Sequence, residues 1–535
     1  MKSAIALIIA ILMAVGTRAA EQAFQLSADR AIIYTQKLDL NGGETLLDIL
    51  RIYPDLMQEG FDNMLDGYNL RINNGPVNGD TRLLCSKIPA SAIAKIQICD
   101  NSAVAKGTVG MGRVIDITLA DSNSGFSGTS NLEAGSDKLI AHTFDTRITS
   151  GGTDIYAIAA YSYQDIDQSV RQRQNISAHM VNRFTPCDRL FTDITQQYND
   201  TRMYPGDGIN KTSFEKYMAR LRYFHDFPNS SELLLGANCQ YTDNPHSVIL
   251  NDASETKGIS SVFSFLLAEF TAPIIAGMSA TVGWEYDFDY SRHKSPDATH
   301  KFDHSNNDLY AQVKYNRGMW RFCIGDRVSF YHYGSPNGSH CDTRNNIEAS
   351  AIAAFSPSGQ MQLAYHRKFL NPSFLVDEDL SNDEWLLIKQ SLTATYIDEI
   401  KFAYTLTRSN MVVNVSSAYV FMQNADNFWQ IGSSIYYKLG ILNLTAGTNI
   451  YANEHSNKSF ATFHLAPRLS LPYDIHAASS MVFTTSNTSL PHGEDVYCDL
   501  KIDKEIGSHW KVMAEWHDIF TSRYSAFTGG VQYSF

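Results

Sequence analysis

Beyond residue 120, apolar and polar side chains alternate along most of the chain. In His509–His517, tryptophan, valine and alanine occupy one side of the segment, while histidine, lysine and glutamate recur on the other. The segments 308–315 and 496–503 repeat this pattern. A period of two residues predicts β-strands. Because charged residues recur on one face of strand after strand, the pattern favours a barrel with a lipid-facing apolar surface and a wet lumen over a soluble sandwich.

Short and long connections alternate between these strands. Tight turns such as Gly151-Gly152, Arg317-Gly318 and Leu439-Gly440 are separated by longer polar stretches. Outer-membrane barrels have this asymmetry, with short periplasmic turns and longer outer loops. The stretches predicted as outer loops are 165–212, 243–258, 292–306, 334–345, 371–381, 452–457 and 486–493.

The strand count follows from these connections. We count about 20 strands, and one more hairpin fits within residues 165–212 or 371–396. The prediction for residues 121–535 is therefore an all-β transmembrane protein, a closed antiparallel outer-membrane β-barrel of about 22 strands, with a range of roughly 20 to 22. The terminal strand, Arg523–Phe535, alternates and ends in an aromatic residue. We expect it to close against the first strand near 126–134, because lipid tolerates no open sheet edge.

A different pattern occupies residues 43–119. Apolar residues between Leu46 and Tyr53 have the spacing of a short helix with one buried face, and Pro54 ends it. Short extended pieces joined by Asp-Gly and Asn-Gly turns follow. Residues 88–98 predict a helical turn that runs into a strand, and a glycine-rich stretch leads into the strand Arg113–Leu119. These elements predict a small α/β domain ahead of the barrel.

Taken in order, the helix, the hairpin, the segment IPASAIAKIQI, the glycine-rich loop and GRVIDITL resemble the plug domain of TonB-dependent outer-membrane receptors. The resemblance implies a plug domain, residues 43–120, in the lumen of a 22-stranded barrel in the bacterial outer membrane. It also implies ligand contacts at the apical turns of the plug. By position these are Asn73, Asn74, Asn101 and Ser102. The alternative interpretation is a small soluble α/β domain fused to another unit.

The beginning of the chain reads as a targeting segment. An apolar run from Ala4 to Val15 follows Lys2 and is too short to span a bilayer, so residues 1–20 are predicted to be a secretory signal peptide. Residues 21–42 are predicted to be a periplasmic N-terminal extension. The family usually carries near this point a short segment that pairs with TonB, and Glu21–Ser27 offers no convincing match.

Composition supports a membrane barrel without identifying its cargo. The 535 residues carry a net charge of −13 and include 28 Tyr, 28 Phe and 6 Trp, enough for two aromatic girdles. Lysine and arginine are scattered, which argues against nucleic acid as a partner. The seven cysteines form no zinc motif; Cys85 and Cys99 either pair in an oxidising periplasm or are separate small apolar residues.

Candidate chemistry is confined to histidines. We find no GxSxG, HExxH or Walker motif and therefore expect neither an enzyme nor a bound cofactor. His293, His300 and His304 share one predicted outer loop, and His340 lies in the next. Imidazoles beside carboxylates suit Zn, Cu, Fe or haem, and such binding should weaken as the pH falls through about 6.5. The alternative is that these are ordinary polar loop residues.

Two functions remain open at this point. The first is a TonB-dependent receptor that binds a scarce nutrient, such as a metal chelate or haem, at the outer face and imports it to the periplasm. Its partners would be the TonB complex, outer-membrane lipid and lipopolysaccharide, and a surface lipoprotein. The second is a plugged barrel that does not transport and has a structural or assembly role. The complete plug favours the first, whereas the missing TonB segment and short loops favour the second.

Overall fold

The computed structural model describes an N-terminal part in pieces and most of the remaining chain. The described residues are 23–26, 30–38, 45–50, 68–72, 75–76, 85, 88, 90–99, 113–120 and 125–535, the last with gaps at 137, 167–168, 205–207, 251–252, 295–298, 336–337, 357, 371–394, 409, 423–426, 454–458, 486–495, 518 and 520–525.

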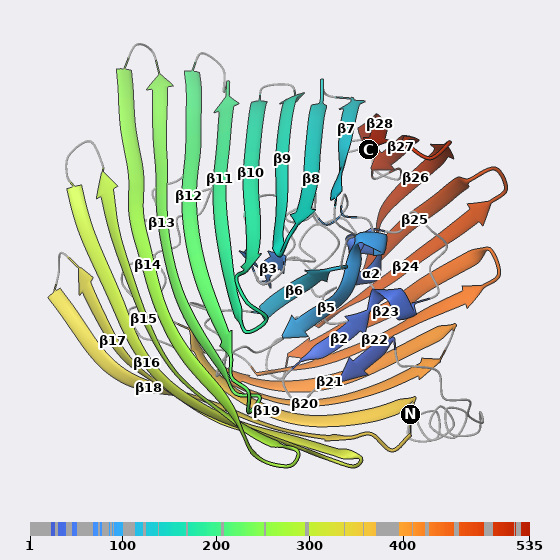
Figure 1. Cartoon of the computed structure of the whole chain (residues 1–535). Coiled ribbons are helices and arrows are strands. Elements are labelled where there is room, and N and C mark those ends of the chain that lie inside the picture. Colours follow the sequence, from blue (N-terminus) through green and yellow to red (C-terminus); the bar gives the residue numbers. More distant parts are fainter. Residues whose placement is uncertain are drawn as a thin grey trace.

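The strands β7 to β28 form one closed antiparallel barrel (Figure 1). Their bounds are β7 Gly125–Gly135, β8 Ile140–Ser150, β9 Thr153–Ile166, β10 Ser169–Arg183, β11 Asp188–Met203, β12 Gly208–Asp226, β13 Glu232–Leu250, β14 Ala253–Ile275, β15 Met278–Lys294, β16 Thr299–Arg317, β17 Trp320–Ser335, β18 Gly338–Ala353, β19 Gly359–Leu370, β20 Thr395–Arg408, β21 Met411–Met422, β22 Phe428–Leu439, β23 Leu442–Asn453, β24 Phe460–Leu471, β25 Ile475–Thr484, β26 Val496–Ile506, β27 Trp510–His517 and β28 Ala526–Ser534. The prediction of a closed barrel is confirmed at 22 strands, and the hairpin expected within 165–212 is β10 and β11.

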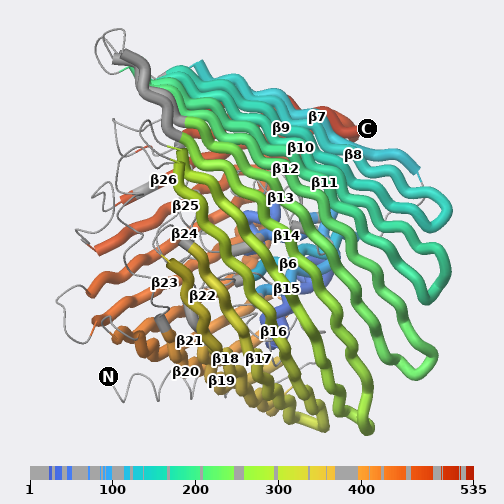
Figure 2. The backbone as a smooth tube through the Cα atoms, turned by 90° about the vertical axis from the view of Figure 1, so that its left-hand side faces the viewer, coloured from blue at the N-terminus to red at the C-terminus, as the bar shows by residue number. Residues whose placement is uncertain are grey.

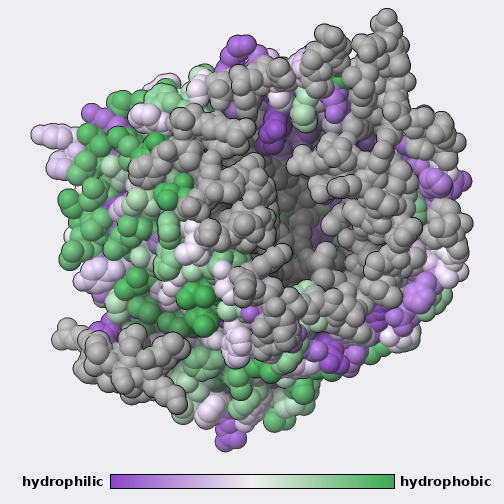
Figure 3. Space-filling model, turned by 180° about the vertical axis from the view of Figure 1, so that it is seen from behind, coloured by the Kyte–Doolittle hydropathy of each residue, from purple (hydrophilic) through white to green (hydrophobic). Residues whose placement is uncertain are grey.

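The two faces of the wall differ because successive side chains on a strand point to opposite sides. On β27, Trp510, Val512 and Trp516 face outward and are 51%, 42% and 48% exposed, while Met513 between them is buried. Hydrophobic residues gather in the same way over the outer flank seen in Figure 3. We call this surface the apolar band. It is suited to contact with lipid chains.

No helix in the described part of the chain has the length and apolar character needed to cross a membrane.

Tight turns lie at one end of the barrel, together with Phe535; we call it the turn end. Several of them need a backbone conformation that glycine adopts most easily. Gly152, Gly318 and Gly507 have φ of 94°, 59° and 65°. Because the strands are antiparallel, the short connections identified in the sequence lie together at this end.

One side of the barrel is taller than expected. The strands β12 to β18 have 16 to 23 residues, whereas β19 to β28 have 8 to 14. Crossing a bilayer takes only about 9 to 11. The predicted outer loops at 243–258, 292–306 and 334–345 are consequently wrong, because most of each is strand. Polarity misled the prediction: beyond the apolar band both faces of a strand are polar, yet the ladder still pairs the backbone groups.

A six-stranded sheet lies inside the barrel (Figures 1 and 2). Its strand order is β1-β2-β5-β6-β3-β4, and only the β3–β6 pair is parallel. The bounds are β1 Phe24–Leu26, β2 Ala31–Tyr34, β3 Tyr68–Ile72, β4 Gly75–Pro76, β5 Ile93–Cys99 and β6 Arg113–Leu119, with α2 at Leu46–Leu50 and single 3-10 turns η1 at Thr35–Lys37 and η3 at Ala90–Ala92. The helix, the turn before β5 and the last strand match the predicted plug elements.

The N-terminal extension was assigned wrongly where the structure describes it. Phe24, Leu26, Ala31 and Ile33 are at most 3% exposed and belong to β1 and β2, which join the plug sheet through β5. Their alternation was the available signal, but the two strands have only three and four residues. The plug therefore begins before residue 43.

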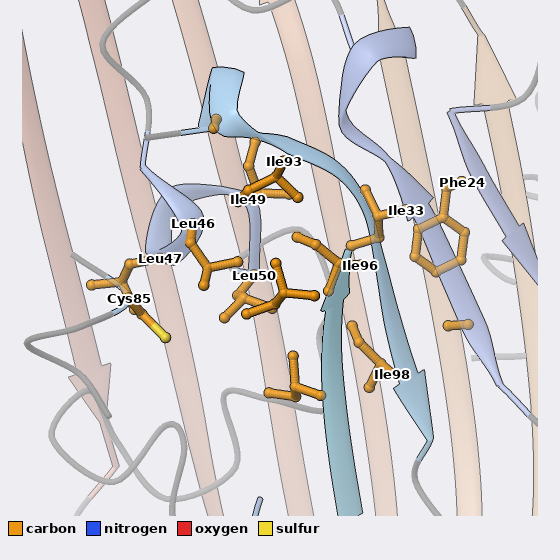
Figure 4. Packing of buried hydrophobic residues seen from close by; sticks show 14 of the residues in the cluster. Phe24, Ile33, Leu46, Leu47, Ile49, Leu50, Cys85, Ile93, Ile96 and Ile98 are labelled. Atoms are coloured by element: carbon orange, nitrogen blue, oxygen red, sulfur yellow. The ribbon is translucent and has the colours of Figure 1, made fainter. Parts of the chain in front are cut away.

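The plug core packs the short helix against this sheet (Figure 4). Leu46, Leu50, Ile33 and Ile96 are fully buried, each contributing about 1.5–3 kcal/mol relative to exposure. Asp48 holds the first turn of α2, since its carboxylate accepts the backbone N–H of Thr45 at 2.9 Å. Cys85 is buried in the same core, and its pairing with Cys99 stays a prediction.

Polar contacts hold the plug edge against the barrel. The backbone N–H of Leu26 donates to the Gln360 amide oxygen at 2.7 Å, and the Arg321 guanidinium donates to the Leu26 carbonyl at 2.6 Å. The Thr407 hydroxyl donates to the carbonyl of Phe24 at 3.2 Å. These bonds satisfy the outer edge of β1, which would otherwise present unpaired backbone groups to the lumen.

The closing strand supplies a first test. Phe535 stacks on Phe126 and Phe144 at 5.2 and 6.0 Å, and its backbone exchanges two hydrogen bonds with Gly128. Deleting residues 533–535 should lower the amount of folded, heat-modifiable barrel severalfold, because the seam between β28 and β7 loses these contacts. Phe527→Ala, on the outer face of the same strand, is the control and should keep most of the folded protein. Normal folding of the truncated chain would contradict the role of the seam.

Candidate ligand-binding wall

The inner faces of β15 to β18 form a continuous polar and aromatic wall, which we call the tall wall. Register aligns these strands in rows: His304 lies opposite Asp289 on one side and opposite Tyr333 on the other, and Tyr333 lies opposite His340. Because alternate residues share a face, all four of these side chains belong to the inner side. The long strands thus carry ligand-capable side chains beyond the level of the apolar band.

The upper part of the tall wall is aromatic. Phe302, Tyr331 and Tyr333 form a cluster in which each is at most 3% exposed. The His293 ring meets Phe302 edge-on at 4.6 Å, and the Arg344 guanidinium lies over Tyr331 at 5.2 Å. The packed rings therefore hold imidazole and guanidinium groups in fixed positions on the inner wall.

The lower part is charged and tightly paired. The Arg327 guanidinium contacts Glu285 at 3.1 Å and Asp308 at 2.8 Å and lies over the ring of Tyr310 at 4.6 Å. The Tyr310 hydroxyl donates to Glu269 at 2.8 Å. Carboxylates outnumber cations among these five residues, so the network gives the inner wall an acidic character while linking the four strands β14 to β17.

A second buried group lies on another part of the inner wall and was not anticipated from the sequence. The Nδ1 atom of His179 is 2.9 Å from Asp193, and Arg222 approaches the other oxygen of Asp193 at 3.4 Å. Tyr156 stacks over His179 at 6.4 Å. These residues lie at inward positions on the four consecutive strands β9 to β12. The alternation of apolar and polar residues along each strand was the only sequence signal for them. As in the tall wall, a buried arginine here contacts a buried carboxylate on a neighbouring strand.

The predicted site residues have different outcomes. Asn73, Asn74, Asn101 and Ser102 lie outside the described residues. His293, His300, His304 and His340 lie on strands rather than in loops, at inward positions, with His293 opposite His300 in the ladder. Among the described residues, no three His, Cys, Asp or Glu side chains come together in a way that could hold a metal ion.

His304 lies above the apolar band, where outward neighbours such as Asp303 are polar. Its ring tilts against Tyr331 at 4.7 Å, and Nδ1 is 3.9 Å from Asp287. Burial lowers the pKa of His304 to about 4. The imidazole is therefore neutral at ordinary pH and can act as a hydrogen-bond donor and acceptor.

Comparison with known proteins finds similarity in fold but not in sequence. No protein-family model matches the chain, and no curated protein matches its sequence. The ferripyoverdine receptor of the outer membrane of Pseudomonas aeruginosa is 12% identical, with a TM-score of 0.70 covering 97% of this chain and 89% of that one. The alcaligin outer-membrane receptor FauA from Bordetella pertussis is 11% identical, with a TM-score of 0.66 covering 97% of both chains. The copper transporter OprC is 11% identical, with a TM-score of 0.69 covering 97% and 100%.

The chain has the fold of a TonB-dependent outer-membrane receptor. The resemblance read from the plug segment is thereby confirmed at the level of fold, and at 11 to 12% identity it extends no further. A closed barrel with an apolar outer face is suited to the bacterial outer membrane, because closure leaves no open sheet edge against lipid. The cargoes of the similar receptors are not transferred by this likeness.

The charged network supplies a second test. Arg327→Met should destabilise the barrel by about 3–5 kcal/mol, because it leaves Glu285 and Asp308 buried without their cation. Arg317→Met, at an exposed position of the turn end, is the control and should change stability by less than about 1 kcal/mol. Denaturant unfolding in detergent measures both. Equal midpoints for the two variants would show that the network contributes little.

Proposed function

We propose that this protein is an outer-membrane receptor that binds a metal chelate at the tall wall and admits it past the plug. The observation that carries the proposal is the aromatic and histidine-bearing inner wall of a closed barrel whose lumen holds a plug sheet. A barrel whose lumen holds a sheet is suited to selective uptake rather than to free diffusion through an open pore. The partners would be the TonB complex in the periplasm and lipopolysaccharide around the rim, with a surface lipoprotein as a further candidate.

A chelate fits the wall better than a bare ion. The described residues offer no three-ligand metal group, whereas the tall wall is built on the packed rings of Phe302, Tyr331 and Tyr333, with the Arg344 guanidinium over Tyr331. Ring stacking combined with a few convergent polar groups is the usual way to bind an organic ligand. Receptors of similar fold are described as binding ferripyoverdine and alcaligin, which agrees with this class of cargo.

The alternative is a plugged barrel that does not transport. One observation favours it: β1 is paired in the plug sheet and its edge is bonded to Gln360, Arg321 and Thr407. A TonB segment that pairs by strand addition must be free to leave the plug. Energised uptake by this protein therefore requires that these contacts with β1 break, or that a residue outside the described range binds TonB.

Uptake and binding test the proposal together. Tyr331→Leu should weaken binding of the matching ferric chelate at least about tenfold, because it removes the ring against which His304 and Arg344 pack. Phe330→Leu, one residue away on the outer face of β17, is the matched control and should bind normally. Titration of the purified barrel with a panel of ferric chelates, Cu²⁺ and haem measures affinity, and cells with and without TonB measure uptake.

Two outcomes would count against this function. If no member of the panel binds more tightly than about millimolar, the tall wall is not a ligand site. If binding occurs but uptake is the same without TonB, passage is passive and the energised receptor is excluded. Binding without any uptake supports the structural alternative.

The pH dependence of binding is a separate prediction. Because burial holds the pKa of His304 at about 4, its imidazole stays neutral between about pH 7.5 and about pH 5.5. Any binding contribution from His304 should be unchanged over that interval and should be lost only as the pH falls through about 4. This differs from the sequence-based expectation of a loss near 6.5. Titrations of wild type and His304→Gln at several pH values measure it, and a His304-dependent fall near 6.5 would overturn it.

A further inference from the structure

The outer face of the same strands carries a cysteine, a histidine and an aspartate in line. The Nδ1 atom of His332 on β17 is 3.3 Å from the Cys341 sulfur on β18, and its Nε2 atom is 3.4 Å from a carboxylate oxygen of Asp303 on β16. Register places His332 directly opposite Cys341, and Asp303 opposite Gly334. Three neighbouring strands therefore contribute one member each.

Gly334, which lies opposite Asp303, leaves room for the Asp303 carboxylate. A Cβ atom at Gly334 would lie 2.4 Å from the nearest carboxylate oxygen of Asp303, closer than real contacts allow. With no side chain at this position, the carboxylate can lie diagonally across β17 and reach His332. The backbone of Gly334 has ordinary strand geometry, so conformational freedom does not explain a glycine at this position. Its role here is to leave space.

The thiol lies at an open position. Cys341 is exposed, and His332 and Asp303 have 40% and 47% of their side-chain surface exposed. On β17 the apolar band extends up to Phe330, so this group lies just beyond it. The ladder between β18 and β19 is formed only from Glu348 to Ala353, which leaves Cys341 on a part of β18 beyond that pairing.

We propose that Cys341 is a reactive thiol that exchanges with disulfides reaching the outer face of the barrel, with His332 as its proton acceptor and Asp303 as a positioning residue. A nucleophile next to a base that is oriented by a third group is the general arrangement for an activated thiol. A metal site is a poorer explanation, because His332 turns different nitrogens towards the sulfur and the carboxylate. The inference does not depend on transport.

The exchange balances without another reactant. His332 Nδ1 takes the proton of the Cys341 thiol, and the thiolate attacks one sulfur of the incoming disulfide. The old S–S bond breaks, a new S–S bond forms with Cys341, and the leaving thiolate takes the proton from the imidazolium. Cys341 is oxidised and the released group is reduced. The Asp303 carboxylate, 3.4 Å from Nε2, stabilises the positive ring by its charge.

The test measures the reaction of the full-length barrel in detergent with dithiodipyridine, a disulfide without charge. Cys341→Ser assigns the fast phase. His332→Gln should slow that phase about three- to tenfold, and added imidazole should restore the rate of His332→Ala in part, which a structural role would not allow. As single substitutions, Asp303→Asn and Gly334→Ala should each slow the fast phase. Added to His332→Gln, neither should slow it further.

A matched thiol on the same strand is the control. Thr343→Cys in the Cys341→Ser background places a thiol at the next outward position, opposite Phe330, without the His and Asp partners. It should react at least about threefold more slowly than Cys341. Oxidised glutathione and a disulfide-bonded protein domain, offered separately, then distinguish a small partner from a protein partner.

Three results would overturn the inference. The fast phase could persist in Cys341→Ser, the Thr343→Cys thiol could react as fast as Cys341, or His332→Gln could leave the rate unchanged. Heat-modifiable migration confirms that each variant is folded, so a slow rate is not mistaken for a lost barrel. Each result is independent of cargo binding at the inner wall, which the same preparations can be used to measure.

Discussion

The constraint on which this molecule depends is that lipid offers no hydrogen bonds to a polypeptide backbone. Every strand that crosses the bilayer must be paired on both sides, so the sheet has to close, and β28 must meet β7. Closure of 22 strands creates a lumen wide enough to hold the six-stranded sheet. The plug sheet, its isoleucine and leucine core and the polar inner wall all lie in or face that lumen. The apolar band is the outer counterpart of the same constraint.

Beyond the bilayer, water can hydrogen-bond the backbone and the constraint no longer applies. On one side of the barrel the strands nevertheless extend well past the bilayer. The strands from β12 to β18 continue as a paired sheet wet on both sides, and each face carries its own chemistry. The inner face holds Tyr331, Tyr333 and His304, while the outer face holds Asp303, His332 and Cys341. Because the side-chain period is two, His332 belongs to the outer face and Tyr331 and Tyr333 to the inner face.

Sequence predicted the architecture well and the site poorly, for physical reasons. Alternation identifies strands wherever one face meets lipid, which is why the barrel, the turns and Phe535 were predicted correctly. The same signal fails where both faces are polar, so His293, His300 and His304 were placed in a loop although each belongs to a paired strand. Partners across strands, such as Asp303 with His332 or Arg327 with Glu285, depend on register, which the sequence of one strand does not determine. The two short strands at Phe24 and Ile33 were missed because three residues carry too little pattern.

The hairpin at the start of the plug determines how the plug would respond to force. Phe24 lies opposite Ile33 at the open end of the β1–β2 pair, and Leu26 lies opposite Ala31 nearer the connection. A pull from the N-terminal side would therefore peel the pair apart one bond at a time rather than shear all of its bonds together. The Thr407 contact to Phe24 would yield before the Gln360 and Arg321 contacts to Leu26. Peeling needs less load than shearing, so a modest tension applied at this one point would free β1 while the β2–β5 and β5–β6 ladders of the sheet stay paired.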